Sequence, residues 1–383
     1  MIRKWAPLIM MSVLLIAGCK GFWDAPAGSS GGGGTTTASS GIFYVANVAA
    51  SQIVGYSIDS GVVTALTGSP YAVPAAPVAM TVAPDNSFLY ASTVTGIYVY
   101  TIASNGALTL ANGGSPISSD PAQSMQVDAT DSWLIEVVSG SPNVYAIALN
   151  PSTGGTASST EQFAALPNSA VQQVAISPDN LHVFVAMGAG GTEVLPFTAT
   201  NKDPLGAVGN IPVVNAAGAA LSVAVDPSSR LFYIGETAAT AGSNTGGLRV
   251  FDMSTFKEIT GSPFASQGLA PYSILPISTG DYVYAVNRQV SGSSTGVIAG
   301  YAITSTNSVY SLTALGSTFA GGTNPQAIVE DNTGTFVLIT DFGGNPDLKG
   351  YTFDTTNAGY LDAVISSATG TDPVQANAIA ALH

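Results

Sequence analysis

Histidine and cysteine, which carry much of enzyme chemistry, are nearly absent from this chain. Its 383 residues include two histidines, His182 and His383, and a single cysteine, Cys19. A single cysteine excludes an internal disulfide and a Cys-x-x-Cys site. Two histidines, one of them the last residue, leave a Ser-His-Asp site without a well-placed base. The sequence also lacks the H-E-x-x-H and EF-hand metal motifs.

Charge is also scarce. Asp, Glu, Lys and Arg make up 8% of the chain, against about 25% in an average soluble protein. The net charge is −14, from 23 acidic and nine basic residues. Arg3, Lys4 and Lys20 precede any plausible folded domain, and the other basic residues are scattered singly. Because nucleic-acid binding needs clustered Lys and Arg, we expect none here.

The N-terminus has the pattern of a bacterial export signal. Arg3 and Lys4 precede an apolar run, Trp5 to Ala17, which is too short to span a bilayer comfortably. The following Ile16-Ala17-Gly18-Cys19 resembles the lipobox, in which the cysteine is lipidated and becomes the new N-terminus. We therefore predict a lipoprotein signal peptide over 1–18 and lipidation of Cys19. The alternative is an ordinary cleaved signal with an incidental cysteine.

Residues 19–41 begin with the predicted lipidated cysteine and continue as a Gly/Ser/Thr-rich stretch. Such a composition buries too little apolar surface to fold. A Gly/Ser-rich chain of about 22 residues spans roughly 25 Å, enough to hold a domain clear of a membrane. We expect the protein in the bacterial cell envelope, anchored by its N-terminal lipid in the periplasm or at the outer membrane or cell surface.

One short pattern recurs along the rest of the chain. VAISPDNLHVFVAMG at 174–188 joins two apolar stretches through a Pro-Asp-Asn corner, and near-copies stand at 80–93, 223–235 and 328–340. The strands after the corners align at Ile42, Phe88, Trp133, His182, Leu231, Tyr282 and Phe336. The gaps between them are 46, 45, 49, 49, 51 and 54 residues. Such a period, with four short strands per unit and no sustained helical pattern, is typical of propeller blades.

We therefore predict an all-β, seven-bladed β-propeller over residues 42–383, with four antiparallel strands per blade. The corner joins the innermost strand of a blade to its second strand, since Pro, Asp and Asn suit tight turns. The domain begins at a second strand, IFYVAN (42–47), and ends at an innermost strand, ANAIAAL (376–382). The C-terminal strand should thus join blade 1 and close the ring, which removes open sheet edges.

The strands YVAN (44–47) and YAVN (284–287) and the corner SPDN (177–180) resemble those of YVTN-repeat, lactonase-type propellers. This family includes 6-phosphogluconolactonase-like proteins, and the likeness covers nearly the whole chain from residue 42. It implies a seven-bladed fold. Enzymes of the group generally use His, Glu and Arg around the channel mouth, and this chain shows no His there.

The fifth residue past each aligned position samples one rim of the predicted channel. These residues are Asn47, Thr93, Val138, Met187, Glu236, Asn287 and Asp341. We predict that Glu236, Asp341 and the adjacent Arg288 line one pocket, where a carboxylate acts as a base and Arg288 holds a carboxylate or an oxyanion. Asn47 and Asn287 are candidate ligand-binding residues, or structural residues that close the repeat. These oxygen donors also suit Ca²⁺, although no cofactor is required.

The loops that lead into the innermost strands supply a second set of rim residues. They are Asp120, Gln123, Gln172, Tyr272, Gln326, Asp372 and Gln375. Uncharged amides around a channel suit a sugar or another neutral polar ligand, so Gln326 and Gln375 are candidate ligand-binding residues. They lie in two related stretches, GTNPQA and GTDPVQA, which favours a framework role as the alternative.

Two functions follow. The first is a lipid-anchored binding or protein-interaction scaffold, favoured by the lack of His and by long blade-specific loops at 237–247 and 289–297. Its partner would be a protein or a carbohydrate. The alternative is a lactonase-type hydrolase or isomerase acting on a lactone or a sugar-derived substrate at the channel mouth. We expect a monomer, because a closed propeller does not need to oligomerise for stability.

Overall fold

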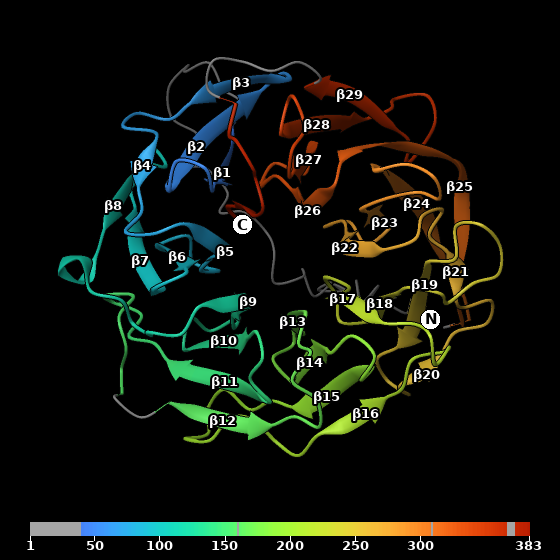
Figure 1. Ribbon diagram of the computed structural model, residues 1–383, viewed down its shortest axis with the longest axis horizontal. Coiled ribbons are helices and arrows are strands. Elements are labelled where there is room, and N and C mark those ends of the chain that lie inside the picture. Colours follow the sequence, from blue (N-terminus) through green and yellow to red (C-terminus); the bar gives the residue numbers. More distant parts are fainter. Residues whose placement is uncertain (1–39, 159–160, 308, 366–371) are drawn as a thin grey trace, which may run out of the picture. The chain divides into compact units, whose positions relative to one another are not determined.

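Seven antiparallel sheets, the predicted blades, follow one another around a ring (Figure 1). The computed structural model describes residues 40–158, 161–307, 309–365 and 372–383. The seven-bladed fold predicted from the repeat is confirmed, and the secondary structure of the described residues is strand except for one short 3₁₀ turn, η1 (Asn112–Gly114). The predicted signal peptide, Cys19 and the tether up to residue 39 lie outside the described residues.

Each blade is described from its innermost strand outwards. Blade 1 contains β30 (Ile379–Ala381), β1 (Gly41–Asn47), β2 (Gln52–Asp59) and β3 (Val62–Ala65), and β4 (Tyr71–Ala72) also pairs with β2. Blade 2 contains β5 (Pro77–Val82), β6 (Phe88–Thr93), β7 (Gly96–Ile102) and β8 (Leu108–Leu110). Blade 3 contains β9 (Ala122–Val127), β10 (Trp133–Val138), β11 (Asn143–Ala148) and β12 (Gln162–Ala165). Blades 4 and 5 contain β13 (Gln173–Ile176), β14 (His182–Ala186), β15 (Thr192–Pro196) and β16 (Gly209–Ile211); and β17 (Ala220–Val225), β18 (Leu231–Glu236), β19 (Gly247–Asp252) and β20 (Lys257–Glu258), with β21 (Phe264–Ala265) also on β19. Blades 6 and 7 contain β22 (Pro271–Pro276), β23 (Tyr282–Asn287), β24 (Thr295–Thr306) and β25 (Val309–Thr323); and β26 (Pro325–Glu330), β27 (Phe336–Asp341), β28 (Leu348–Phe353) and β29 (Leu361–Ile365).

The second strand of each blade is the most buried. β6, β18 and β27 are buried at every residue. Their sequences are nearly continuous runs of aromatic and branched residues, because both faces of these strands are covered by neighbouring sheets. The outermost strands β3, β12 and β29 are partly exposed, which explains their weaker apolar pattern.

The hydrophobic core is divided into seven clusters, one for each interface between adjacent blades. The cluster between blades 2 and 3, for example, combines Phe88 and Tyr90 with Leu134 and Ile147. The cluster between blades 7 and 1 combines Leu338 with residues of both chain ends, including Val45 and Ile379. No blade thus buries its faces alone, and the ring is the unit of stability.

The C-terminal strand closes this ring as predicted. β30 pairs with β1 in antiparallel register, with Phe43 opposite Ala381 and Val45 opposite Ile379. The Ala46 N–H also donates to the Ala378 carbonyl at 3.0 Å. β30 contacts the innermost strands on both sides, β5 and β26. Blade 1 is therefore built from the two ends of the described chain.

The recurring corner has one backbone feature in all six of its copies. Two residues before each aligned strand position, the backbone has a φ between 52° and 72°, at Asn86, Asp131, Asn180, Ser229, Gly280 and Gly334. Only Gly adopts this left-handed region freely, and Asn and Asp tolerate it best among the others. This requirement explains why the repeat ends its corner with Asn, Asp, Ser or Gly.

Polar side chains link each innermost strand to the next. The inner edge of such a strand faces no further strand, so its backbone groups need other partners. Ser124 and Gln126 accept hydrogen bonds from the Val174 and Ile176 N–H groups at 3.2 and 2.9 Å. Gln173 and Ser273 accept in the same way from the Val223 and Ile328 N–H groups. Ser222 instead donates to the Pro271 carbonyl, because proline has no N–H. These bonds fix the innermost strands relative to one another.

The left-handed corner position gives a direct test. We expect Ser229→Val to lower the free energy of unfolding by about 1–2 kcal/mol more than Ser229→Gly does, because a β-branched residue is strained at this φ. Both variants lose the hydrogen bond that Ser229 Oγ accepts from the Asp179 N–H, so their difference isolates the backbone. Urea unfolding measures it. Equal stability of the two variants would show that the corner does not demand a left-handed residue.

Candidate functional site

A β-bulge at the start of the innermost strand marks one end of the ring. In five blades the register against the second strand shifts by one residue, which leaves Val78, Gln123, Leu221, Tyr272 and Gln326 without an opposite residue. The equivalent positions in blades 4 and 1 are Gln172 and Asn377. A bulge re-aims the extra side chain and is common beside functional sites. We call these seven residues the inner rim.

Proline explains part of this local geometry. β5, β22 and β26 each begin with a proline, Pro77, Pro271 and Pro325. Proline has no N–H to donate to a ladder, so it is accepted at the first residue of a strand or at a bulge. The residue that follows it is the bulged one in all three strands.

Arg288 lies at the inner rim of blades 6 and 7. Its guanidinium carbon is 3.0 Å from the centroid of the Tyr272 ring, a cation–π contact. One terminal nitrogen donates to Gln326 Oε1, and Gln326 in turn donates to the Asn324 carbonyl at 2.7 Å. Arg288 Nε is buried and has no hydrogen-bond partner. Burial lowers the pKa of Arg288 from its usual value.

The other polar members of the inner rim lie in blades 3, 4 and 1. Gln123 donates to the Gln172 carbonyl at 3.5 Å, and the Gln172 amide donates to Ala170 at 3.0 Å. The Asn377 amide donates to the Pro77 carbonyl at 3.1 Å, whereas Asn377 Oδ1 is buried without a partner. With Tyr272 and Gln326, these residues form a mainly uncharged polar rim. Asn377 was missed by sequence reasoning, although it directly follows the GTDPVQA stretch.

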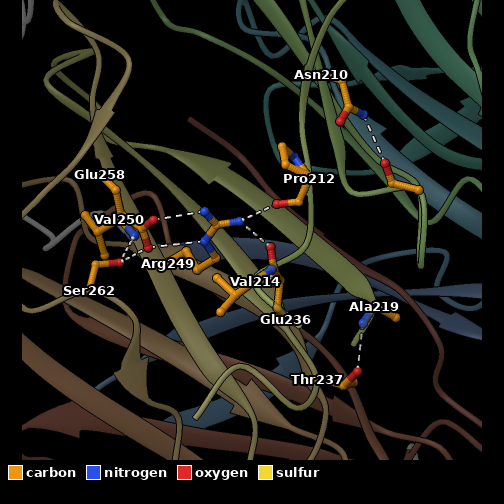
Figure 2. A network of polar contacts seen from close by, with 11 residues as sticks. Asn210, Pro212, Val214, Ala219, Glu236, Thr237, Arg249, Val250, Glu258 and Ser262 are labelled. Carbon is orange, nitrogen blue, oxygen red and sulfur yellow. Dashed lines mark hydrogen bonds and ion pairs between the residues drawn. The ribbon is translucent and has the colours of Figure 1, made fainter. Parts of the chain in front are cut away.

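Glu236 is placed in a buried network rather than on an exposed rim. Its side chain is fully buried, Oε1 is 2.8 Å from Arg249, and Oε2 accepts the Val214 N–H at 3.0 Å. Figure 2 shows Arg249 between Glu236 and Glu258, the latter at 2.9 Å. Both carboxylate oxygens of Glu236 are thus committed to partners within blade 5 and the loop before it. The carboxylate for which the sequence suggested the role of a base is thus paired with an arginine.

Asp341 is also buried, at the end of β27. Its Oδ2 is 2.6 Å from Lys349 Nζ and accepts the Thr323 N–H at 3.3 Å, while Oδ1 has no partner. Burial raises the pKa of this carboxyl to about 6, against the opposing effect of Lys349. The structure therefore gives Glu236, Arg288 and Asp341 separate sets of partners and no contact with one another among the described residues.

The predicted ligand-binding residues also separate. Gln326 contacts Arg288, as described above. Asn287 is fully buried and exchanges two hydrogen bonds with Ser266, at 2.6 and 2.8 Å. Asn47 accepts the Ala50 N–H at 3.3 Å within its own turn, and the Gln375 N–H donates to Asp347 at 2.6 Å. Of these four residues, the structure brings only Gln326 to Arg288.

Both histidines lie at the corner end of their blades, away from the inner rim. His182 begins β14 and packs on the Phe256 ring with centroids 5.0 Å apart. His383 N–H donates to Asn86 Oδ1 at 2.8 Å. Among the described residues, no group of three or more His, Cys, Asp or Glu side chains lies close enough to hold a metal ion. The described segments also contain no helix long and apolar enough to cross a membrane.

Comparison with known proteins identifies the fold. No protein-family model and no curated protein sequence matches the chain. Among solved structures, a proposed 6-phosphogluconolactonase of Bacteroides fragilis superposes with a TM-score of 0.70 at 13% identity, over 92% of this chain and 100% of that one. The periplasmic gluconolactonase of Pseudomonas aeruginosa superposes with a TM-score of 0.68 at 15% identity, over 90% and 99% of the two chains. This chain has their fold. The predicted resemblance to lactonase-type propellers is thereby confirmed for the architecture, since such low identity concerns the fold alone.

The Glu236–Arg249 pair gives a test of stability. We expect Arg249→Met to lower the free energy of unfolding by about 3–5 kcal/mol, because it leaves the Glu236 carboxylate buried without its counter-charge. Adding Glu236→Gln should recover part of this loss, because the uncompensated charge is then removed. A double-mutant cycle by urea unfolding measures the coupling. Additive losses would show that the two side chains are not energetically paired.

Asp341 predicts a pH dependence of stability. Its pKa of about 6 lies above the ordinary 3.8, so the folded state binds more protons than the unfolded state between these values. The free energy of unfolding therefore falls as the pH rises from about 4 to about 6. We expect the free energy of unfolding of Asp341→Asn to fall less over this pH range than that of the wild type. Asp59→Asn, on the exposed surface, should show the same fall as the wild type. Unfolding curves across this range that are parallel for wild type and Asp341→Asn would contradict the assignment.

Proposed function

We propose that this protein binds a small organic anion of the sugar-acid type at the inner rim, beside Arg288. The observation that carries the proposal is the buried Arg288 Nε, which has no partner while the rest of the guanidinium is fixed by Tyr272 and Gln326. An arginine fixed in this way is preorganised for a carboxylate, which it can hold through two parallel hydrogen bonds.

The pairing of the other arginines supports this choice. Arg230 is 2.7 Å from Asp226, and Arg249 is paired with Glu236 and Glu258. Arg288 is the one arginine of the described residues that has no carboxylate partner. In a chain with a net charge of −14, a buried arginine without a carboxylate partner is a selective site for an anion.

The surrounding amides favour a hydroxylated ligand. Gln123, Gln172, Gln326 and Asn377 offer donors and acceptors on several blades, and Asn377 Oδ1 still lacks a donor. Convergent amides of this kind bind sugar hydroxyl groups in many sites. A ligand whose carboxylate binds Arg288 and whose polyol chain lies across the rim would use both the arginine and the amides. As part of the proposal, the predicted lipid on Cys19 would hold this binding domain at the bacterial cell envelope.

Lactone hydrolysis is the second candidate, and it is favoured by the likeness to proteins named as gluconolactonases over about nine-tenths of the chain. In that reaction Arg288 would stabilise the oxyanion that forms when water attacks the lactone carbonyl. The described inner rim offers no histidine, and Glu236 is occupied by Arg249. We therefore keep binding of a sugar acid as the first candidate function and hydrolysis of its lactone as the second.

The binding proposal is tested by calorimetry on the purified full chain with gluconate, galactonate and glucose. We expect the two acids to bind and glucose to bind more weakly. Arg288→Gln should raise the Kd of the acids about tenfold or more, because a charge-assisted hydrogen bond contributes about 1.5–3 kcal/mol. Lys202→Gln removes the same charge at an exposed site and should change nothing. Binding of the acids that survives Arg288→Gln, or no binding at all, would contradict the proposal.

The second candidate is tested on glucono-1,5-lactone at neutral pH, with and without Ca²⁺, by titration of released acid. Turnover above the spontaneous rate that disappears in Arg288→Gln would establish a lactonase. Turnover that also disappears in Glu236→Gln/Asp341→Asn, in a variant that still folds, would restore the role predicted for the two carboxylates from the sequence. A rate equal to that of the uncatalysed reaction would leave binding as the function.

A further inference from the structure

Glu136 occupies a position that is apolar in every other blade. It is the third residue after the aligned strand start, where the other blades have Val45, Ala91, Val185, Ile234, Ala285 and Ile339. The Glu136 side chain is fully buried, and neither carboxylate oxygen has a hydrogen-bond partner. Burying an unpartnered carboxyl group is unfavourable, so this residue needs a reason beyond packing.

The register of β10 shows which way Glu136 points. It lies on the same strand face as Leu134, which packs in the cluster between blades 2 and 3. Leu134 is opposite Ile147 on β11 and Glu136 is opposite Tyr145, so all four side chains share that face. Ile147 lines a cleft of about 300 Å³ between the two blades. Glu136 itself does not line the cleft, but it projects from the same sheet face as Ile147, which does.

Blade 2 contributes a second unpartnered polar group to the same interface. Ser92 on β6 is fully buried, and its Oγ has no partner. It lies opposite Ala79 and Ile97, which pack in the cluster between blades 2 and 3. Ile97 is in turn bridged to Ser118, at the wall of the cleft. Each of the two blades therefore buries one polar side chain without a partner in the interface that the cleft borders.

Two more carboxylates line the cleft itself. Asp120, which precedes β9, is exposed, and Glu161, which precedes β12, is partly buried. Burial, and then the charges of Glu161 and Asp120, raise the pKa of Glu136 to about 8. Burial and Asp120 also raise the pKa of Glu161. The three carboxyl groups are thus close enough to affect one another, yet they do not surround one point as metal ligands would. No basic residue lines this cleft.

We propose that the cleft between blades 2 and 3 binds a small organic cation with a primary ammonium group. The ammonium group lies against Asp120 and Glu161, and Glu136 behind the wall supplies the third negative charge. A ligand with three N–H donors suits spread carboxylates better than a divalent metal, which demands a compact set of oxygen ligands. One ammonium group cannot satisfy all of these carboxylates at once. A ligand with a second ammonium group can pair with the remaining carboxylate, so diamines should bind more tightly than monoamines. The site is separate from the inner rim and does not rest on the proposed function.

Binding is coupled to a proton. Glu161, Asp120 and Tyr145 from blade 3, and Tyr90 from blade 2, are the titratable groups packed around Glu136. When the cleft is empty, Glu136 keeps its proton at pH 7. A bound cation favours the ionised carboxylate, so the proton leaves as the ligand arrives.

The test is calorimetry of the purified full chain with 1,4-diaminobutane and with butylamine at pH 7, at constant ionic strength. Two buffers with different ionisation enthalpies report the number of protons released. We expect binding of the diamine, weaker binding of the monoamine, and release of close to one proton. Tetramethylammonium, which has the charge but no N–H donor, should not bind measurably.

The matched variants are Glu136→Gln and Glu193→Gln. Glu193 is likewise fully buried with an unpartnered oxygen, but it lies in blade 4. Glu136→Gln should weaken diamine binding about tenfold or more and abolish proton release, while Glu193→Gln leaves both unchanged. Asp120→Asn, on the exposed wall, tests the site without disturbing the core and should also weaken binding. The absence of amine binding at pH 7 to 9, or equal binding by wild type, Glu136→Gln and Asp120→Asn, would overturn the proposal.

Discussion

Each sheet of this protein has two apolar faces and can bury them only against its neighbours in the ring. The seven clusters between blades carry the core, and the second strands such as β6, β18 and β27 are buried along their whole length. This constraint leaves little freedom in the middle of a blade. Most variation is therefore found at the ends of the strands and in the outermost strands, and Glu136 in the middle of β10 is the exception.

The two ends of the ring are used differently. At the corner end, a residue with left-handed backbone conformation recurs in the same place in all six corners. The residue type there is chosen by the turn, which requires that conformation. At the opposite end, the bulged residue changes from blade to blade, from Val78 to Gln123 to Tyr272. The ring thus has a uniform corner end and, at the end of Arg288, a variable one, which is where blades on a rigid scaffold differ in chemistry.

The sequence was sufficient for the fold because its signals are local and repeated. The corner recurs six times and the strand pattern seven times, so blade number, strand order and closure by β30 could all be predicted. The site was harder to predict. Tyr272 and Gln326 could be named as rim residues from the sequence, but the β-bulges at these positions depend on pairing with a second strand. The partners of Glu236 and Asp341 also come from a neighbouring strand, and the contacts of Arg288 join two blades, so no local pattern encodes them. The signal for Glu136 was present as a single charge in the apolar strand WLIEVV.

Blade 1 has a consequence for the order in which the chain matures. Its sheet pairs β1, from the start of the described chain, with β30, from the end. Contacts between such distant segments are the slowest to form, since a long loop must close before they are gained. Six blades can therefore assemble while the first still lacks its innermost strand, and the ring stays open until β30 has been synthesised and pairs with β1. During that interval the inner edge of β1 is unpaired and can pair with other strands. Pairing of β30 with β1 therefore ends the period in which the nascent chain can misassemble.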